Sequence, residues 1–203
     1  MKDFSIISVS IINLLIGIRY CILIYKKEIK PALAMWVFFT LAVVMSLITY
    51  LADGNFSIWD NILNTTDIIL VTTVSVFIFI FGDKSSKFNK FDLGCLIAVL
   101  IIVVFWLFSK NHLVTNLFIQ IILVISYFPV ISRLFKSKEN TEPFSVWIGM
   151  MLAPVFALLS SKGLLATIYS VRAIICVLLL LLLMTRIEFL VKKKVEVSQN
   201  DNK

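Results

Sequence analysis

Three polar side chains recur along one side of an otherwise apolar stretch, residues 58–81. Asp60, Asn64 and Asp67 follow one another at helical spacing, which on an α-helix leaves them within roughly 60° of each other. A carboxylate at bilayer depth costs about 2.5–3.5 kcal/mol, so such residues face the protein interior and usually mark a pathway or a site. Asp60 begins the stretch and is expected to be solvated at the interface. Asp67 lies deeper, where it serves either a solute or proton site or a structural ion pair.

Arg172 is a basic partner for these acids. It follows the loop glycine Gly163 by nine residues, whereas Asp60 and Asp67 follow Gly54 by six and thirteen. Arg172 is therefore predicted at a depth between the two acids, and an Asp67–Arg172 pair would neutralise both charges. Such a pair either locks the bundle or opens and closes with protonation or solute.

A milder polar face is predicted on two further helices. Asn13 and Tyr20 are seven residues apart, as are Gln120 and Tyr127, and Asn116 lies one turn before Gln120. Amides and phenols lining a midplane cavity can bind hydroxyl or carboxamide groups. Hydrogen bonds between helices, worth about 0.6 kcal/mol each, are the structural alternative. The candidate substrate-binding or coupling residues are Asn13, Asn64, Asp67, Asn116, Gln120 and Arg172.

Two prolines lie inside apolar stretches and predict kinks. Pro129 and Pro154 each remove one backbone hydrogen bond, and a kink can be a hinge or a static bend. Near Pro154, the small residues Gly149, Ala153 and Ala157 recur every four positions. This stripe predicts close helix packing.

The elements that must position these residues are membrane helices. The chain has 203 residues, 60% hydrophobic and 15% charged, with a mean hydropathy of +1.01. Soluble domains are less apolar and more charged, and a spanning helix needs about 20 largely apolar residues. Seven segments qualify, and we expect an all-α, multi-pass membrane protein. The predicted transmembrane helices are 4–25, 31–52, 58–81, 91–109, 113–135, 144–161 and 164–190.

The distribution of basic residues predicts the orientation. Seven crossings place fourteen of the 19 lysines and arginines on one side of the membrane and Lys2, Lys110 and Lys162 on the other, while Arg19 and Arg172 lie within segments. The positive-inside rule then predicts the N-terminus outside and the C-terminus in the cytoplasm of a cell (inner) membrane. The fourteen are Lys26, Lys27, Lys30, Lys84, Lys87, Lys90, Arg133, Lys136, Lys138, Arg186, Lys192, Lys193, Lys194 and Lys203.

One sequence pattern occurs twice. Residues 18–36 and 126–147 each contain an apolar run, a basic cluster, a proline and a second apolar run with a tryptophan, Trp36 or Trp147. Both tryptophans are expected to be interfacial anchors rather than caps of a cavity. The pattern predicts two parallel three-helix bundles joined by a linker helix. The corresponding divisions are 1–81 for the first bundle, 82–112 for the loop and linker helix, 113–190 for the second bundle and 191–203 for a disordered cytoplasmic tail.

This layout resembles the SWEET and wider PQ-loop superfamily. Residues 127–130 read YFPV and are followed by Arg133, Glu142-Pro143 and Trp147, similar to the PQ-loop consensus of an aromatic residue, proline and glutamine before a basic loop. Val130 stands where that consensus has glutamine, and the first half has no helix proline. The resemblance implies seven helices in a 3+1+3 order and helix hinges, of which Pro129 matches one.

The resemblance and the polar residues favour a transporter of a small polar solute, working by alternating access. A non-transporting receptor or assembly factor on the same bundle is the alternative. An enzyme is not expected, because His112 is the one histidine and no nucleophile or phosphate-binding motif occurs. We expect no cofactor or metal, no nucleic-acid partner, and contact with the lipid bilayer. Two bundles make a complete unit, and association into a homo-oligomer stays open.

Overall fold

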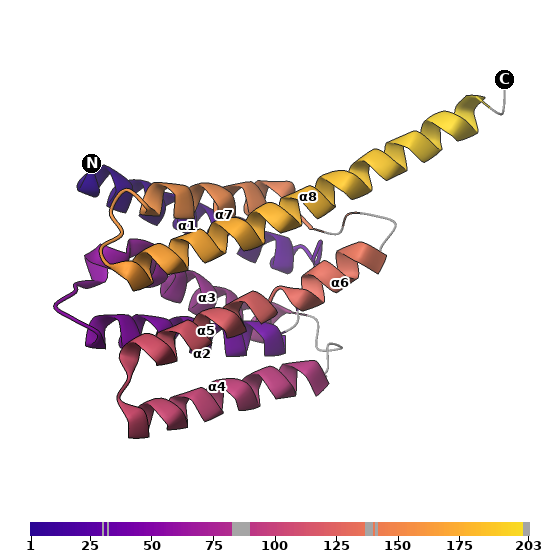
Figure 1. The fold of residues 1–203 in the computed structure, drawn as a ribbon. Helices are drawn as coiled ribbons and strands as arrows, with labels where there is room; N and C mark the ends of the chain where they lie inside the picture. Colours follow the sequence, from indigo (N-terminus) through magenta and orange to yellow (C-terminus); the bar gives the residue numbers. More distant parts are fainter. Residues whose placement is uncertain (30, 32, 83–89, 137–139, 141, 201–203) are drawn as a thin grey trace.

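A computed structural model describes residues 1–29, 31, 33–82, 90–136, 140 and 142–200. Several residues of the basic tally lie outside the described residues, namely Lys30, Lys84, Lys87, Lys138 and Lys203. All regular structure in the described ranges is helical, as the composition predicts. Figure 1 shows a bundle in which α8 extends well beyond the other helices at its C-terminal end.

The predicted segments are helices. Three of them are long and apolar enough to cross a membrane: Lys2–Tyr25, Ile58–Phe81 and Leu164–Phe189. The other apolar helices of the described part are shorter. The elements are α1 (Lys2–Tyr25), α2 (Leu33–Ala52), the 3-10 helix η1 (Ile58–Asn61), α3 (Ile62–Phe81), α4 (Lys90–Ser109), α5 (His112–Ile125), α6 (Phe128–Lys136), α7 (Phe144–Ala157) and α8 (Leu164–Asn200).

The fifth predicted segment is interrupted rather than continuous. Helix α5 ends at Ile125, a turn follows at Ser126 and Tyr127, and α6 begins at Phe128. Pro129 is the second residue of α6, where its missing N–H costs nothing because the first turn of a helix has no intrahelical acceptor for it. Pro154, in contrast, lies inside α7. Its missing N–H removes the usual donor to the Met150 carbonyl.

The helices pack in a pattern that is similar in the two halves of the chain. Helix α3 packs against α1 and α2, and α8 packs against α7 and against α5 and α6. Between the halves, α1 packs against α7 and α2 against α5. Exchanging the first three segments with the last three therefore exchanges these contacts with one another, whereas the smaller contact of α3 with α7 lies outside this pattern. Helix α4 packs against α5 and α2 at one side of the bundle (Figure 1).

The predicted close packing at the small-residue stripe is present. A Cβ placed on Gly149 of α7 would lie 2.8 Å from Ile16 Cγ1 of α1. Ala153 and Ala157 are each only 1% exposed and belong to the main hydrophobic core. The stripe thus lets α1 and α7, one from each half, approach closely.

We expect the substitution Gly149→Leu to destabilise the fold, because a larger side chain must displace Ile16 or separate α1 from α7. Overpacking of this kind typically costs about 1–3 kcal/mol. Thermal unfolding of the purified protein in detergent would measure the loss. Gly94→Leu is the matched control, since a Cβ at Gly94 meets nothing within 4 Å and a leucine there should leave the unfolding temperature unchanged or raise it.

Residues 191–200, which are predicted from the sequence to be part of a disordered tail, are helical in the structure. Helix α8 continues to Asn200 without a break, and only 201–203 lie outside the described residues. Neither glycine nor proline occurs between 164 and 200, so no residue type that stops a helix interrupts it.

Candidate functional site

A small chamber with several polar side chains in its lining lies inside the bundle. Its volume is about 30 Å³, enough for one or two water molecules when a water needs roughly 10–15 Å³. Side chains from both halves line it. The polar lining residues are Asn13 of α1, Asp67 of α3, Tyr127 of the α5–α6 turn and Arg172 of α8. Apolar walls come from α2, α3, α7 and α8, including Phe39, Met150 and Pro154.

Asp67 and Arg172 both line the chamber. The salt bridges among the described residues do not include the predicted Asp67–Arg172 pair. The Asp67 carboxylate accepts from Asn13 Nδ2 at 2.8 Å and from Tyr169 OH at 2.8 Å. Arg172 donates from Nε to Gln120 Oε1 at 2.9 Å and stacks over the Tyr169 ring at 4.7 Å. Tyr169 therefore contacts both charged groups.

A hydrogen-bond network on α2 fixes the position of Gln120. Its Nε2 donates to Ser46 Oγ and to Asn116 Oδ1, both at 3.0 Å. Asn116 Nδ2 donates to the Ser46 carbonyl at 2.8 Å and to Thr49 Oγ1 at 2.9 Å. With its amide oxygen turned to Ser46, Asn64 accepts from that hydroxyl at 2.8 Å and donates to the Val43 carbonyl. These groups are buried and fully bonded, so they hold α2, α3, α5 and α8 together.

The six predicted site residues thus form two groups. Asn13, Asp67 and Arg172 line the chamber, whereas Asn64, Asn116 and Gln120 belong to the network on α2 and do not line it. The shared face predicted for Asp60, Asn64 and Asp67 is wrong, because Asp60 lies in the 3-10 helix before α3 begins. Asn64, Asn116 and Gln120 make hydrogen bonds between helices, which is the structural role given above as the alternative to binding a solute.

A larger pocket adjoins the chamber. Its volume is about 120 Å³, and it shares Phe39, Leu70, Val71, Tyr127 and Met150 with the chamber lining. It extends toward the loops after α1 and after α6, where Pro31 and Glu142 line it. We call this pocket the vestibule.

Aromatic side chains from both copies of the repeated pattern, together with Phe39 of α2, meet in the vestibule. Ring centroids are 5.0 Å apart for Tyr20 and Trp36, 6.4 Å for Phe39 and Tyr127, and 6.3 Å for Tyr127 and Trp147. Trp36 and Phe39 complete the series at 6.5 Å. Such contacts are typical of favourable aromatic pairs. The repeat places corresponding residues, Tyr20 with Tyr127 and Trp36 with Trp147, around one pocket.

The prediction that Trp36 and Trp147 are interfacial anchors is wrong. Their side chains are 9% and 8% exposed and line the vestibule. Trp147 Nε1 donates to Glu142 Oε2 at 3.1 Å, whereas Trp36 Nε1 is buried without an acceptor among the described residues. Trp59, in contrast, is 50% exposed, as an interfacial residue would be. A position near a helix end does not distinguish a lipid-facing tryptophan from a pocket-lining one.

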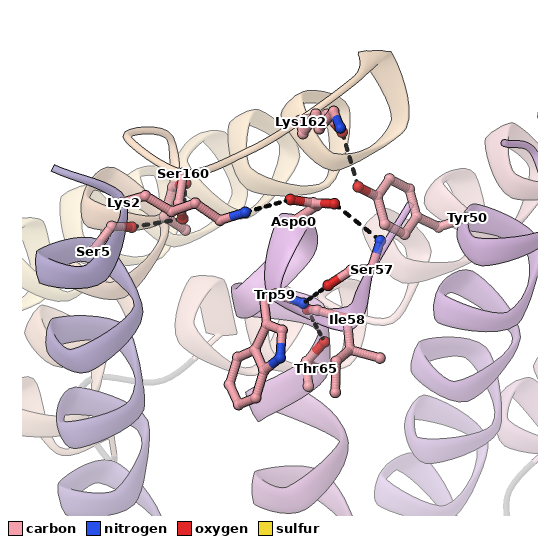
Figure 2. Close-up of polar contacts among 11 residues, drawn as sticks. Lys2, Ser5, Tyr50, Ser57, Ile58, Trp59, Asp60, Thr65, Ser160 and Lys162 are labelled. Atoms are coloured by element: carbon pink, nitrogen blue, oxygen red, sulfur yellow. Dashed lines mark hydrogen bonds and ion pairs between the residues drawn. The ribbon is translucent and has the colours of Figure 1, made fainter. Parts of the chain in front are cut away.

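The opposite end of the bundle is closed by polar contacts, one within the first half and three between the halves. Figure 2 shows Lys2 of α1 beside Asp60, with Lys2 Nζ 2.7 Å from Asp60 Oδ1. The Asp60 carbonyl accepts from the Lys162 backbone N–H at 2.9 Å. Asp60 is only 5% exposed, so its predicted solvation at the interface is wrong. The second carboxylate oxygen, Asp60 Oδ2, accepts from the Ser57 backbone N–H at 2.9 Å, and this bond is part of the cap of the 3-10 helix.

Two further contacts complete this closure. Tyr50 OH donates to the Lys162 carbonyl at 2.9 Å, and Ser5 Oγ lies 2.7 Å from Ser160 Oγ (Figure 2). The Tyr50 ring also stacks on Phe56 at 4.8 Å. We call the contacts Lys2–Asp60, Asp60–Lys162, Tyr50–Lys162 and Ser5–Ser160 the seal.

Phe56 explains the two loop glycines of the repeat. A Cβ on Gly54 or Gly163 would lie 2.9 Å or 2.8 Å from the Phe56 ring. Gly163 also has a φ of 82°, which side chains rarely tolerate. Both glycines thus allow the loops of the two halves to close over the same ring.

Sequence reasoning missed several residues that contact the predicted ones. Tyr169 lies one helical turn before Arg172, and Ser46 and Thr49 lie one turn apart on α2, so helical spacing could have indicated both sets. Thr66 accepts from Asn13 Nδ2 at 2.8 Å. No spacing signal linked Glu142 to Trp147 across the start of α7.

Comparisons with protein-family models, with curated proteins and with solved structures find no match for this chain.

Proposed function

We propose that this chain is a membrane carrier for a small polar solute, crossing the bilayer seven times and working by alternating access between two three-helix halves. The observation that carries the proposal is the chamber, which is lined by opposite charges from both halves and lies between the seal and the vestibule. Charged residues inside a membrane bundle usually mark a solute or ion pathway. A chamber closed at one end and continued by a pocket at the other is what one state of a carrier requires.

The exchange symmetry of helix packing supports a parallel repeat. Packing of α1 on α7 corresponds to packing of α5 on α2 when the halves are exchanged. An axis along the membrane normal through the chamber would relate the two contacts. This arrangement fits the 3+1+3 order of SWEET-like proteins, with α4 as the linker helix.

The orientation follows from the charge distribution. The seal contains two of the three lysines assigned outside, Lys2 and Lys162, and the vestibule ends at loops that carry the cytoplasmic lysines. We therefore assign the seal to the external face and the vestibule to the cytoplasmic face. The state described is closed to the outside.

An uptake screen in proteoliposomes tests the proposal. The full chain is reconstituted and offered labelled solutes of different classes, among them carboxylates, sugars, amino acids and nucleosides, with protein-free vesicles as the control. Saturable uptake of at least one solute is expected. Absence of uptake together with a stable protein partner on co-purification would instead support the receptor or assembly-factor alternative.

A further inference from the structure

The guanidinium of Arg172 has hydrogen-bonding capacity that the protein does not use. The side chain is 8% exposed, its Nε donates to Gln120, and its Nη1 has no acceptor among the described residues. A guanidinium carries five N–H donors. Leaving a charged donor buried and unbonded costs more than leaving a neutral one. Because Arg172 lines the chamber, an acceptor inside the chamber would satisfy it.

The carboxylate already in the chamber does not fill this role. Asp67 accepts from Asn13 and Tyr169 and makes no salt bridge with Arg172. Gln120 is likewise held by Ser46 and Asn116, which fixes the guanidinium plane through its Nε. A guanidinium fixed in this way matches the two oxygens of a planar carboxylate.

The dimensions and lining of the two spaces restrict the solute further. The chamber, at about 30 Å³, has room for one small group, and the vestibule, at about 120 Å³, has room for more. The vestibule is walled by the rings of Tyr20, Trp36 and Trp147, which favour an apolar or aromatic body. Asp67 would repel a further negative charge on the solute, beyond the one carboxylate that binds Arg172. A monoanion is therefore favoured over a dianion.

Trp36 provides a second, independent indication of a ligand. Its Nε1 is buried without an acceptor among the described residues, in a side chain 9% exposed that lines the vestibule. A buried indole N–H usually finds a partner. An acceptor atom on the body of the solute would supply one.

We propose that Arg172 is the anion-recognition residue of this site and that the solute is a small monocarboxylate with an apolar or aromatic body. The inference rests on the proposed function, because it assigns the chamber and vestibule to one solute. The carboxylate binds Arg172 in the chamber, and the body packs between the aromatic rings of the vestibule beside Trp36.

Matched pairs of acid and amide test the chemistry on the unmodified protein. The probes are benzoate against benzamide and phenylacetate against phenylacetamide, added to the purified full chain at constant ionic strength. A ligand that binds the folded state raises the unfolding temperature with concentration. We expect at least one acid to raise it saturably and its amide not to. Equal shifts for acid and amide, or a shift with sodium sulfate as large as with the acids, would overturn the carboxylate assignment.

Variants locate the site. Arg172→Gln is expected to weaken binding of the acid by roughly 10- to 100-fold, the loss expected for charge-assisted hydrogen bonds. Arg172→Lys, which keeps the charge but not the planar fork, should weaken it less. Arg186→Gln is the matched control, because Arg186 is exposed on the same helix and lies over the Phe135 ring. Unchanged affinity in a folded Arg172→Gln or Arg172→Lys protein would contradict the proposal.

Failure of this inference is distinguishable from failure of the proposed function. If the uptake screen identifies a solute without a carboxylate and the acids do not bind, the inference is wrong and the carrier stands. If an acid binds through Arg172 but no solute is taken up, the site assignment stands and the chain is a receptor.

Discussion

Cysteines introduced together at positions 5 and 160 are expected to lock the seal and abolish uptake. The Oγ atoms of Ser5 and Ser160 lie 2.7 Å apart, which places the two Cβ atoms near the separation of roughly 3.5–4.5 Å that a disulfide needs. One residue belongs to α1 and the other to the turn after α7, so the bond would join the halves where the proposed carrier must open. Oxidation of Ser5→Cys/Ser160→Cys should lower the initial uptake rate at least roughly 10-fold, because opening at this end is required for exchange.

Reduction should restore uptake, which separates locking from misfolding. The single variants Ser5→Cys and Ser160→Cys are the matched controls, and both retain Cys21, Cys95 and Cys176, which are free thiols in the structure. Both should transport at the same rate with and without oxidant. A disulfide verified by mass spectrometry that leaves uptake at the rate of the reduced protein would show that this end of the bundle need not open.

The helices could be predicted from the sequence because apolar length and breaker residues are local signals. Each predicted apolar segment contains a helix, the fifth contains two, and α8 runs on to Asn200 since no glycine or proline stops it. The break between α5 and α6 was harder to place. Pro129 predicts a kink, but the turn lies before it, at Ser126 and Tyr127, where the Tyr127 ring contacts Phe39 and Trp147.

Which residues share the site could be predicted only in part. Depth along a helix follows from residue counting, which predicts Arg172 between Asp60 and Asp67 in depth; in the structure Asp67 and Arg172 line the same chamber. The direction of each side chain depends on how the helices are rotated in the bundle. Asn64, one turn before Asp67, therefore points to Ser46 of α2, while Asp67 contacts α1 and α8.

The repeated sequence pattern relates Trp36 to Trp147, a relation that neither residue indicates on its own. Read alone, Trp36 and Trp147 each resemble an interfacial anchor. Read as a repeat related by an axis through the bundle centre, the two positions must be equidistant from that axis. The structure places both at the same pocket. The repeat pairs these two positions, but whether they face a pocket or lipid depends on how the helices are rotated in the bundle.

Asp67→Asn is expected to reduce the initial uptake rate at least roughly 10-fold while leaving the chain folded. The Asp67 carboxylate accepts one hydrogen bond from Asn13 and one from Tyr169. An asparagine keeps the shape and one acceptor oxygen but removes the negative charge beside Arg172. Hydrogen bonds to charged groups contribute about 1.5–3 kcal/mol each, and the lost charge also leaves Arg172 as the sole charge lining the chamber among the described residues.

The measurement compares uptake per folded protein with the unfolding temperature. Asp53→Asn is the matched control, because Asp53 is exposed in the loop after α2 and its neutralisation should change neither quantity. If Asp67 served only to hold α1, α3 and α8 together, Asp67→Asn would lower the unfolding temperature without changing the uptake rate of the molecules that remain folded. If Asp67 belongs to the solute pathway, the uptake per folded protein must instead fall, whatever the change in the unfolding temperature.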